Sequence, residues 1–211
     1  MKKPQPASQD KAMRVAIDAS SSVSAWLRVP KPARACFLEH GAGAGMTHTL
    51  VQKVSDGLAE RRAATLRYLS PYVERGSKRP DTPTVAHDAV RAACLAARAA
   101  TGLPLFAGGK SFGGRTTSQA QAIAPFPHVA GLAFLGFPLH PPEKPSSERE
   151  EHLTSVHVPM FSFKVRGTSS PNMLECRRWL LNWVRARFCS PFGTRTMVST
   201  CSCGLAGQTR R

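Results

Sequence analysis

A nearly unbroken apolar run at residues 129–137, VAGLAFLGF, constrains the fold more than any other feature. A strand that is apolar on both sides must be covered on both sides, which is typical of parallel sheets between helices. Other short strands are predicted at 19–29, 35–39, 64–69, 103–107 and 158–163. The chain therefore favours a sheet whose strands are buried on two faces.

Helical patterns separate these strands. Apolar residues recur at helical spacing over 50–62, and 85–97 places alanines on one face. Thr84 is a predicted N-cap and Gly102 a predicted C-terminal stop. Residues 115–123 are compatible with a third helix. Strands that alternate with helices predict an α/β domain with a doubly wound, mostly parallel sheet.

The sharpest local motif is GKSFG at 109–113, between a short strand and a helix. In the G-x-S-x-G pattern the serine sits on a strained turn that lifts its hydroxyl clear of the sheet. Gly109 and Gly113 are needed there because side chains would clash with the neighbouring strand or helix. The N–H of Phe112, at the helix start, can face an oxyanion. The pattern predicts Ser111 as a nucleophile; the alternative is an ordinary turn packed against the sheet.

A second glycine-rich segment, HGAGAG at 40–45, follows an early strand and precedes a helix. An acyl-transfer serine needs a second N–H for its oxyanion, and a loop of this kind supplies one. We predict that Ala42 is this donor and that Gly41 and Gly43 are structural glycines of the site. The alternative is a flexible turn without a catalytic role.

Two nucleotide-binding patterns fail at single positions. A P-loop would need a glycine at Pro104, and a dinucleotide fingerprint would need one at Met46. Four cysteines near the C-terminus do not match a zinc spacing: Cys176, Cys189, Cys201 and Cys203. No metal site is predicted.

Four segments together resemble a known family: HGAGAGMTH, SPYVERGSKRPD, AGGKSFGGR and GLAFLGFPLHPPEKPS. They are similar to the α/β-hydrolase branch that includes dienelactone hydrolase, in particular to bacterial members related to NSL-complex subunit three and testis-expressed protein thirty. The resemblance covers 23–163. It implies a three-layer α/β/α sandwich, a Ser–acid–His triad, a small-molecule acyl substrate and no cofactor. Carried over by position, Ser111 is the nucleophile, and Phe112 and Ala42 offer the oxyanion N–H groups.

The expected triad is incomplete. The family places an Asp in a G-T-R-D turn after the next strand and a His in a D-H-x-F stretch near the C-terminus, in the order Ser, acid, His. Here the turn reads GTSS at 167–170, no Asp follows Asp88, and no His follows His157. The triad Asp and His are therefore predicted to be missing, which would leave a poor nucleophile and a crippled or inactive enzyme.

Other side chains are candidates for the missing base and acid. His140 lies in a loop after the elbow, where active-site residues gather, although a lone loop histidine is more often solvated. His152 and His157 lie further on, and the nearby acids are Glu143, Glu148, Glu150 and Glu151. His40 and His48 flank the glycine segment and are expected to brace it.

We predict that a frameshift explains the missing motifs. In the shifted frame, each new codon consists of the last base of one present codon and the first two bases of the next. Read across the junctions between the codons of 163–168, this frame permits Q-G-T-R-D. Those over 195–200 permit D-H-G-F-H, with a forced Gly between Met197 and Val198. Both motifs then stand in one frame and in the family's order.

The charge distribution agrees with this hypothesis. The chain has 29 Lys and Arg against 13 Asp and Glu, a net charge of +16. Residues 164–211 hold nine basic residues and one acid, so half of the excess lies there. We divide the chain into an N-terminal tail (1–18), a hydrolase core with an incomplete C-terminal part (19–163), and a basic, irregular, out-of-frame tail (164–211).

The sequence thus predicts a serine hydrolase for an ester or similar acyl substrate, damaged as written. The alternative is a non-catalytic interaction protein on a hydrolase scaffold. A third hypothesis, a nucleic-acid binder, would rest on the arginines of the tail, which the shifted frame explains more simply. No apolar run suits a signal peptide or a membrane span, so we expect a cytoplasmic protein with no membrane or nucleic-acid partner. No pattern fixes the oligomeric state.

Overall fold

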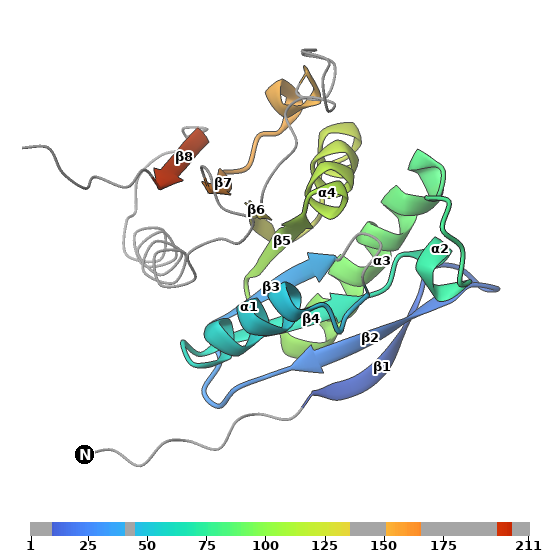
Figure 1. Cartoon of the computed structure of the whole chain (residues 1–211), viewed down its shortest axis with the longest axis horizontal. Coiled ribbons are helices and arrows are strands. Elements are labelled where there is room, and N and C mark those ends of the chain that lie inside the picture. The colour runs from blue at the N-terminus through green and yellow to red at the C-terminus, as the bar shows by residue number, and fades with distance from the viewer. Residues whose placement is uncertain (1–9, 41–44, 136–150, 166–197, 204–211) are drawn as a thin grey trace, which may run out of the picture.

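The computed structural model of the chain describes residues 10–40, 45–135, 151–165 and 198–203. They form one eight-stranded sheet in the order β1-β2-β4-β3-β5-β6-β7-β8 (Figure 1). The strands are β1 (Lys11–Ala16), β2 (Ser22–Arg28), β3 (Ala35–His40), β4 (Ala63–Tyr68), β5 (Leu105–Lys110), β6 (Val129–Leu135), β7 (Met160–Val165) and β8 (Val198–Cys203). Strand β2 runs antiparallel to β1 and β4, and every other neighbouring pair is parallel. The mostly parallel sheet is as predicted.

Helices connect the strands, and Figure 1 shows them beside the sheet. They are α1 (Thr49–Ala59), α2 (Pro71–Glu74), α3 (Pro83–Thr101), α4 (Phe112–Ile123) and the 3₁₀ helix η1 (Glu151–Ser155). Helix α3 ends at Gly102, which adopts φ 64°, as the sequence predicted. Its N-cap is Thr82 rather than Thr84. Pro83 suits the first helical position, because it has no backbone N–H that would be left without a hydrogen bond within the helix.

Alternate residues of β4 show that the helices cover both faces of the sheet. Thr65 meets α1, where its hydroxyl lies 2.7 Å from that of Ser55. Leu66 and Tyr68 point the other way and join a core cluster with Val90 of α3. Helix α1 therefore covers one face, while α3 covers the other together with α4, which packs against it.

Small side chains line the buried side of α3, which lets this long helix lie close to the sheet. They are Ala86, Ala89, Val90, Ala93, Cys94 and Ala97. The strands opposite are fully buried at several positions, such as Leu66, Leu105 and Leu132. The apolar sequence therefore predicted the burial of β5, whereas β6 is less completely covered than predicted: Ala130 is exposed, and Ala133 and Leu135 are only partly buried.

Two segments that the sequence analysis assigned to tails contain strands. Lys11–Ala16, within the expected 1–18 tail, is β1 and pairs with β2. Its signal was the alternation of Met13, Val15 and Ile17, a pattern too short to stand out beside the charged residues that precede and follow it. Val198–Cys203, within the expected irregular tail, is β8 and pairs with β7 along its whole length. The wider division of the chain stays a prediction.

Within the described residues, no helix has both the length and the apolar character needed to cross a membrane.

Candidate functional site

Ser111 lies at the junction between β5 and α4, directly after Lys110 and as the N-cap of α4. Its backbone has φ 49° and ψ −108°, a conformation that residues with a Cβ rarely adopt. The turn is held on both sides: the Ser111 N–H donates to the Leu135 carbonyl at 3.3 Å, and its own carbonyl accepts from the Arg115 N–H at 3.1 Å. Strand, strained serine and helix follow one another as a nucleophile elbow requires.

Glycines around Ser111 permit close backbone approach. Gly109 has φ 152°, which favours glycine, and Gly113 is buried in α4. Two further glycines are also constrained, Gly108 more severely than Gly114. A Cβ at Gly108 would lie 1.7 Å from the Ala133 carbonyl oxygen, and one at Gly114 would lie 3.0 Å from the carbonyl oxygen of Gly109. The turn therefore depends on two pairs of glycines rather than on the two glycines of the motif.

The glycine-rich segment starts beside this turn. Strand β3 ends at His40, which pairs in register with Gly109 of β5 and Tyr68 of β4. The chain is described again from Gly45, which has φ 69° and faces Leu69, the residue after β4. Gly41, Ala42 and Gly43 lie outside the described residues. The oxyanion role of the Ala42 N–H stays a prediction.

An aromatic residue that the sequence analysis did not select lies next to the elbow. Tyr72 packs edge-on against Phe112, with ring centroids 6.4 Å apart and planes at 86°. It belongs to α2, and its N–H donates to Asp81 at 2.8 Å. The guanidinium of Arg115 lies over the Phe112 ring, 5.6 Å from its centroid. Pro71, at the first position of α2, was the available signal for this helix.

His152 is engaged with a serine other than Ser111. Its Nε2 lies 2.8 Å from the hydroxyl oxygen of Ser118. The Ser118 hydroxyl also lies within hydrogen-bond distance of the Arg115 carbonyl, at 2.9 Å. Ser118 lies seven residues beyond Ser111 on α4, about 10 Å along the helix axis. This contact docks η1 onto α4 and does not provide a base for Ser111.

The other candidate bases and acids that the structure describes have places of their own in the fold. His48 caps α1, where its Nδ1 accepts from the Leu50 N–H at 3.2 Å, so it braces the end of the glycine segment. His157 and Glu151 are exposed, and His40 belongs to β3. Four candidates lie outside the described residues: His140, Glu143, Glu148 and Glu150. The described residues contain no cluster of three or more His, Cys, Asp or Glu suited to a metal ion.

The two partly buried histidines give a test by pH. Burial, with the charges of Arg115 and His87, lowers the pKa of His152. Burial, with the charge of Arg91, lowers the pKa of His87, although Gln119 and Asp88 oppose this. Each histidine therefore binds a proton more readily in the unfolded chain. The free energy of unfolding is expected to decrease as the pH falls below about 6.5, the ordinary histidine pKa.

Urea unfolding at pH 7, 6 and 5 measures this effect, and a His152→Gln variant should lose stability less steeply over that range. All three pH values lie above the range in which Asp10 and Glu74 titrate. Hydrogen bonds lower the pKa of both carboxyls, although burial opposes this shift. Equal slopes for the two proteins would contradict the assignment.

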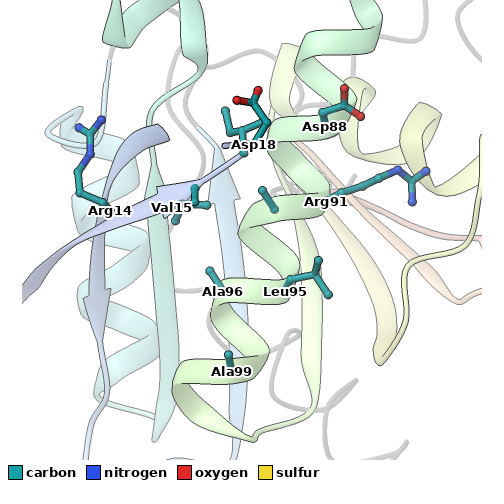
Figure 2. A pocket seen from close by; sticks show the side chains of 11 residues that line it. Arg14, Val15, Asp18, Asp88, Arg91, Leu95, Ala96 and Ala99 are labelled. Atoms are coloured by element: carbon teal, nitrogen blue, oxygen red, sulfur yellow. The ribbon is translucent and has the colours of Figure 1, made fainter. Parts of the chain in front are cut away.

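A pocket of about 500 Å³ lies between β1 and α3 (Figure 2). Strand β1 is four strands from β5 in the sheet, so this pocket is not part of the elbow site. Both of its arginines already have partners within the protein: Arg14 pairs with Glu74, and Arg91 donates to the Ala120 carbonyl. The candidate functional site is therefore the turn at Ser111, where the serine backbone is strained.

The fold and this turn define the class of protein. Residues 32–170 match the model of the family described as alpha/beta hydrolase domain, and the chain belongs to this family. The predicted α/β-hydrolase fold is thereby confirmed.

The structure is similar to several solved hydrolases at low sequence identity. Est1E from Butyrivibrio proteoclasticus has a TM-score of 0.62 and 15% identity over 91% of this chain and 88% of that one. A dienelactone hydrolase from Anabaena variabilis has a TM-score of 0.61 and 18% identity over 92% and 83%. An esterase from Pyrococcus furiosus has a TM-score of 0.63 and 11% identity over 96% and 85%. These likenesses show the fold. No curated protein matches the chain by sequence.

Proposed function

We propose that this chain is a hydrolase-type protein whose nucleophile is Ser111 and whose substrate is a small ester or similar acyl compound. The observation that carries the proposal is the backbone of Ser111, with φ 49° at the β5–α4 junction. Strain of about 1–3 kcal/mol persists only where the surrounding structure holds it, and it is concentrated at active sites. Here the sheet on one side and α4 on the other hold it.

The chemistry follows from the place of the turn. In acyl transfer the Ser111 oxygen would lose its proton and attack the substrate carbonyl, which gives a tetrahedral intermediate with a negative oxygen. Collapse of this intermediate would break the ester bond, the leaving alcohol would take up the proton, and water would then release the acid from Ser111. Phe112 is the first residue of α4, at the end of the helix where the backbone N–H groups and the positive end of the helix dipole lie. The Phe112 N–H and the positive end of the helix would stabilise that oxygen, with Ala42 as the proposed second donor.

The incomplete triad is the second part of the proposal. The family's acid belongs in the turn after β7, which ends at Val165, and there the sequence reads GTSS. We attribute the loss to a shifted reading frame, and we place the intact form in the dienelactone-hydrolase-like branch, near the relatives of NSL-complex subunit three and testis-expressed protein thirty. As written, the chain would retain only the rate that oxyanion stabilisation and binding provide.

Two similar structures support a small acyl substrate. One is described as a dienelactone hydrolase and another as Est1E with ferulic acid bound. In this chain the partly exposed ring of Phe112 lies next to Ser111, packed against the buried Tyr72, which suits the apolar part of such a compound.

A fluorophosphonate probe tests the nucleophile, because it bonds covalently to an activated serine oxygen and loses fluoride. We expect labelling at Ser111, faster in a frame-restored chain than in this one, and none after Ser111→Ala. Ser77→Ala, at an exposed position, is the matched control and should label like its parent. Peptide mass spectrometry locates the label. A frame-restored chain that is not labelled at Ser111 would remove the main support for the hydrolase proposal.

A non-catalytic interaction protein is the second candidate, favoured by the absence of Asp after Asp88 and of His after His157 in the sequence. A partner bound equally well by the Ser111→Ala variant would favour it.

A further inference from the structure

We propose that the pocket between β1 and α3 receives a second copy of this chain, and that the β1 strands of the two copies pair antiparallel about a two-fold axis. This inference goes beyond the proposed function and does not depend on it, because the surface lies four strands away from the strand that carries Ser111. Three features carry it: the open edge of β1, the apolar groove beside that edge, and opposite charges at the two ends of the groove.

Strand β1 is an edge of the sheet that the described residues form, with β2 on one side only. In an antiparallel ladder, residues whose N–H and C=O groups bond the neighbouring strand alternate with residues whose groups point away from it. The Ile17 N–H donates to the Ser21 carbonyl at 2.9 Å. By this alternation, the N–H and C=O groups of Ala12, Arg14 and Ala16 point to the open edge, where such a row of groups is a template for another strand.

The features that usually block an edge from pairing are scarce on β1. The strand contains no proline, and its register with β2 runs from Lys11 to Ala16 without a bulge. Arg14, the charged residue in its middle, donates to the hydroxyls of Ser22 and Ser24 on β2 and pairs with Glu74 of α2. Its guanidinium is therefore held on the inner side of the strand, and the outer main chain stays accessible.

The groove beside this edge is mainly apolar. It encloses about 500 Å³, and its lining includes Val15 and Ile17 from β1 and Ala92, Leu95 and Ala96 from α3. Leu95 is 58% exposed although it is a large apolar side chain, and Figure 2 shows it between the two ends of the groove. A second copy seated on β1 would cover Leu95 in both molecules, because a two-fold interface uses the same surface twice.

One end of the groove is acidic. Figure 2 shows the carboxylates of Asp18 and Asp88 at this end. Hydrogen bonds from Ser21 and Ser20 hold the Asp18 carboxylate and lower its pKa. Asp88 is exposed and takes part in no ion pair within the described part of the chain. This end is therefore suited to a cation from outside.

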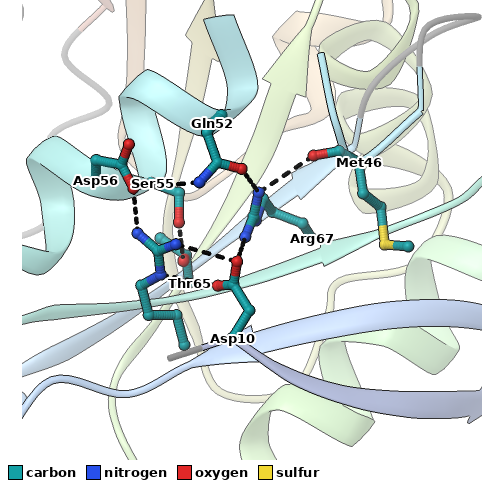
Figure 3. A network of polar contacts seen from close by, with 8 residues as sticks. Asp10, Met46, Gln52, Ser55, Asp56, Thr65 and Arg67 are labelled. Atoms are coloured by element: carbon teal, nitrogen blue, oxygen red, sulfur yellow. Dashed lines mark hydrogen bonds and ion pairs between the residues drawn. The ribbon is translucent and has the colours of Figure 1, made fainter. Parts of the chain in front are cut away.

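Lys11, at the opposite end of β1, is the matching cation. It is exposed, and like Asp88 it forms no ion pair with the residues that the structure describes. Asp10, its neighbour in the sequence, is already engaged: this carboxylate accepts from Arg28 at 2.8 and 3.0 Å and also from Arg67, in the network of Figure 3. The charge of Lys11 is thus not compensated by the adjacent acid.

A two-fold axis at Arg14 satisfies the main chain and the charges together. Antiparallel pairing about this axis sets Ala12 of one copy opposite Ala16 of the other, so all three outward-pointing residues find partners. The two Arg14 residues then face each other, and the ion pair of each with Glu74 offsets their repulsion.

The same pairing sets Lys11 of each copy opposite Ile17 of the other, at the end where Asp18 and Asp88 lie. Each dimer would contain this charge contact twice. The surface is therefore complementary to itself, which is the argument for a second copy as the occupant.

The test is sedimentation velocity of the full chain over a range of concentrations, at low salt and under reducing conditions. Lys11→Glu and Asp88→Lys each reverse one partner of the proposed contact. Lys53→Glu makes the same charge change at an exposed position of α1, on the other face of the sheet, and is the matched control. Ala16→Pro removes one outward N–H and leaves the bonds between β1 and β2; circular dichroism checks that this variant is folded.

We expect the parent to form a dimer as its concentration rises. Lys11→Glu and Asp88→Lys should each weaken association by at least about tenfold, since each places like charges together twice in the dimer. A mixture of these two variants should associate more tightly than either alone, because Glu at position 11 then meets Lys at position 88. Ala16→Pro should also weaken the dimer, whereas Lys53→Glu should stay within about twofold of the parent.

A parent that stays monomeric at every concentration would overturn the proposal. If the N–H groups of 12–16 are then protected from hydrogen exchange, another part of the chain covers the edge instead. A dimer that Lys11→Glu and Lys53→Glu weaken equally, or a mixture that shows no recovery, would place the contact on another surface and overturn the proposal as well. None of these outcomes bears on the labelling of Ser111, so the proposed function stands or fails separately.

Discussion

A chain read one base earlier from codon 163 onward is expected to hydrolyse a simple ester at least about a thousandfold faster than the chain as written. Under our proposal, the shifted frame would supply an Asp after β7 and a His close to the C-terminus. A histidine beside Ser111 would take the proton from its hydroxyl, and the acid would orient the histidine and stabilise its charged form. The comparison is kcat/KM for p-nitrophenyl acetate at neutral pH.

Two controls make this result specific. Ser111→Ala in the restored chain should abolish the gain, because the base then has no nucleophile to activate. The nucleotide sequence of the gene is the second control and can be checked first. In the shifted frame, its codons must encode Q-G-T-R-D over 163–168 and D-H-G-F-H over 195–200. Other residues at these junctions would exclude the frameshift, and restored activity below about tenfold would contradict the mechanism.

The sheet explains why the proposed late frameshift would remove activity but leave the turn at Ser111. Ser111 is held by β5, β6 and α4, all of which precede codon 163. The parallel strands β5, β6 and β7 end at the same edge, and the family's acid would follow the last of them. The nucleophile and its partners are thus brought together by the edge of the sheet but are encoded in different parts of the chain.

The elbow could be predicted because its signals are local. Glycine spacing and the change from an apolar strand to a helix are both visible within 103–123, and the structure places Ser111 where they indicate. The continuous apolar run of β6 was equally informative. Each of these patterns involves only a few consecutive residues. Each also reflects a single physical requirement: close backbone approach for the glycines, and burial for the apolar strand.

The buried polar contacts could not be predicted in this way. Arg67, in AATLRY, has the sequence pattern of a solvent-facing residue on a strand, yet its side chain is 1% exposed. Its burial depends on Asp10, which lies 57 residues earlier in a segment assigned to a tail. The pairing of Ser118 with His152 likewise joins residues 34 positions apart. Such partners become neighbours only once the sheet has formed.

Gly108→Ala is expected to destabilise the fold by at least about 4 kcal/mol, in the range of the most severe single substitutions. The added Cβ would lie 1.7 Å from the carbonyl oxygen of Ala133 and 2.7 Å from its carbonyl carbon. Both are backbone atoms of β6, paired in register with Gly108, so no side chain can rotate away. The two central strands would have to separate where they carry Ser111.

Gly76→Ala is the matched control for this prediction, measured by urea unfolding and soluble yield. Gly76 has φ 69°, and a Cβ added there would meet no atom within 4 Å, so only conformational strain of about 1 kcal/mol is expected. Gly114→Ala should fall between the two, because its Cβ would meet the Gly109 carbonyl oxygen at 3.0 Å and the ring of Phe134 at 3.1 Å. A Gly108→Ala protein as stable as the Gly76→Ala protein would mean that β5 and β6 do not approach as closely as the register requires, and the strained serine would then lose the support that its proposed role depends on.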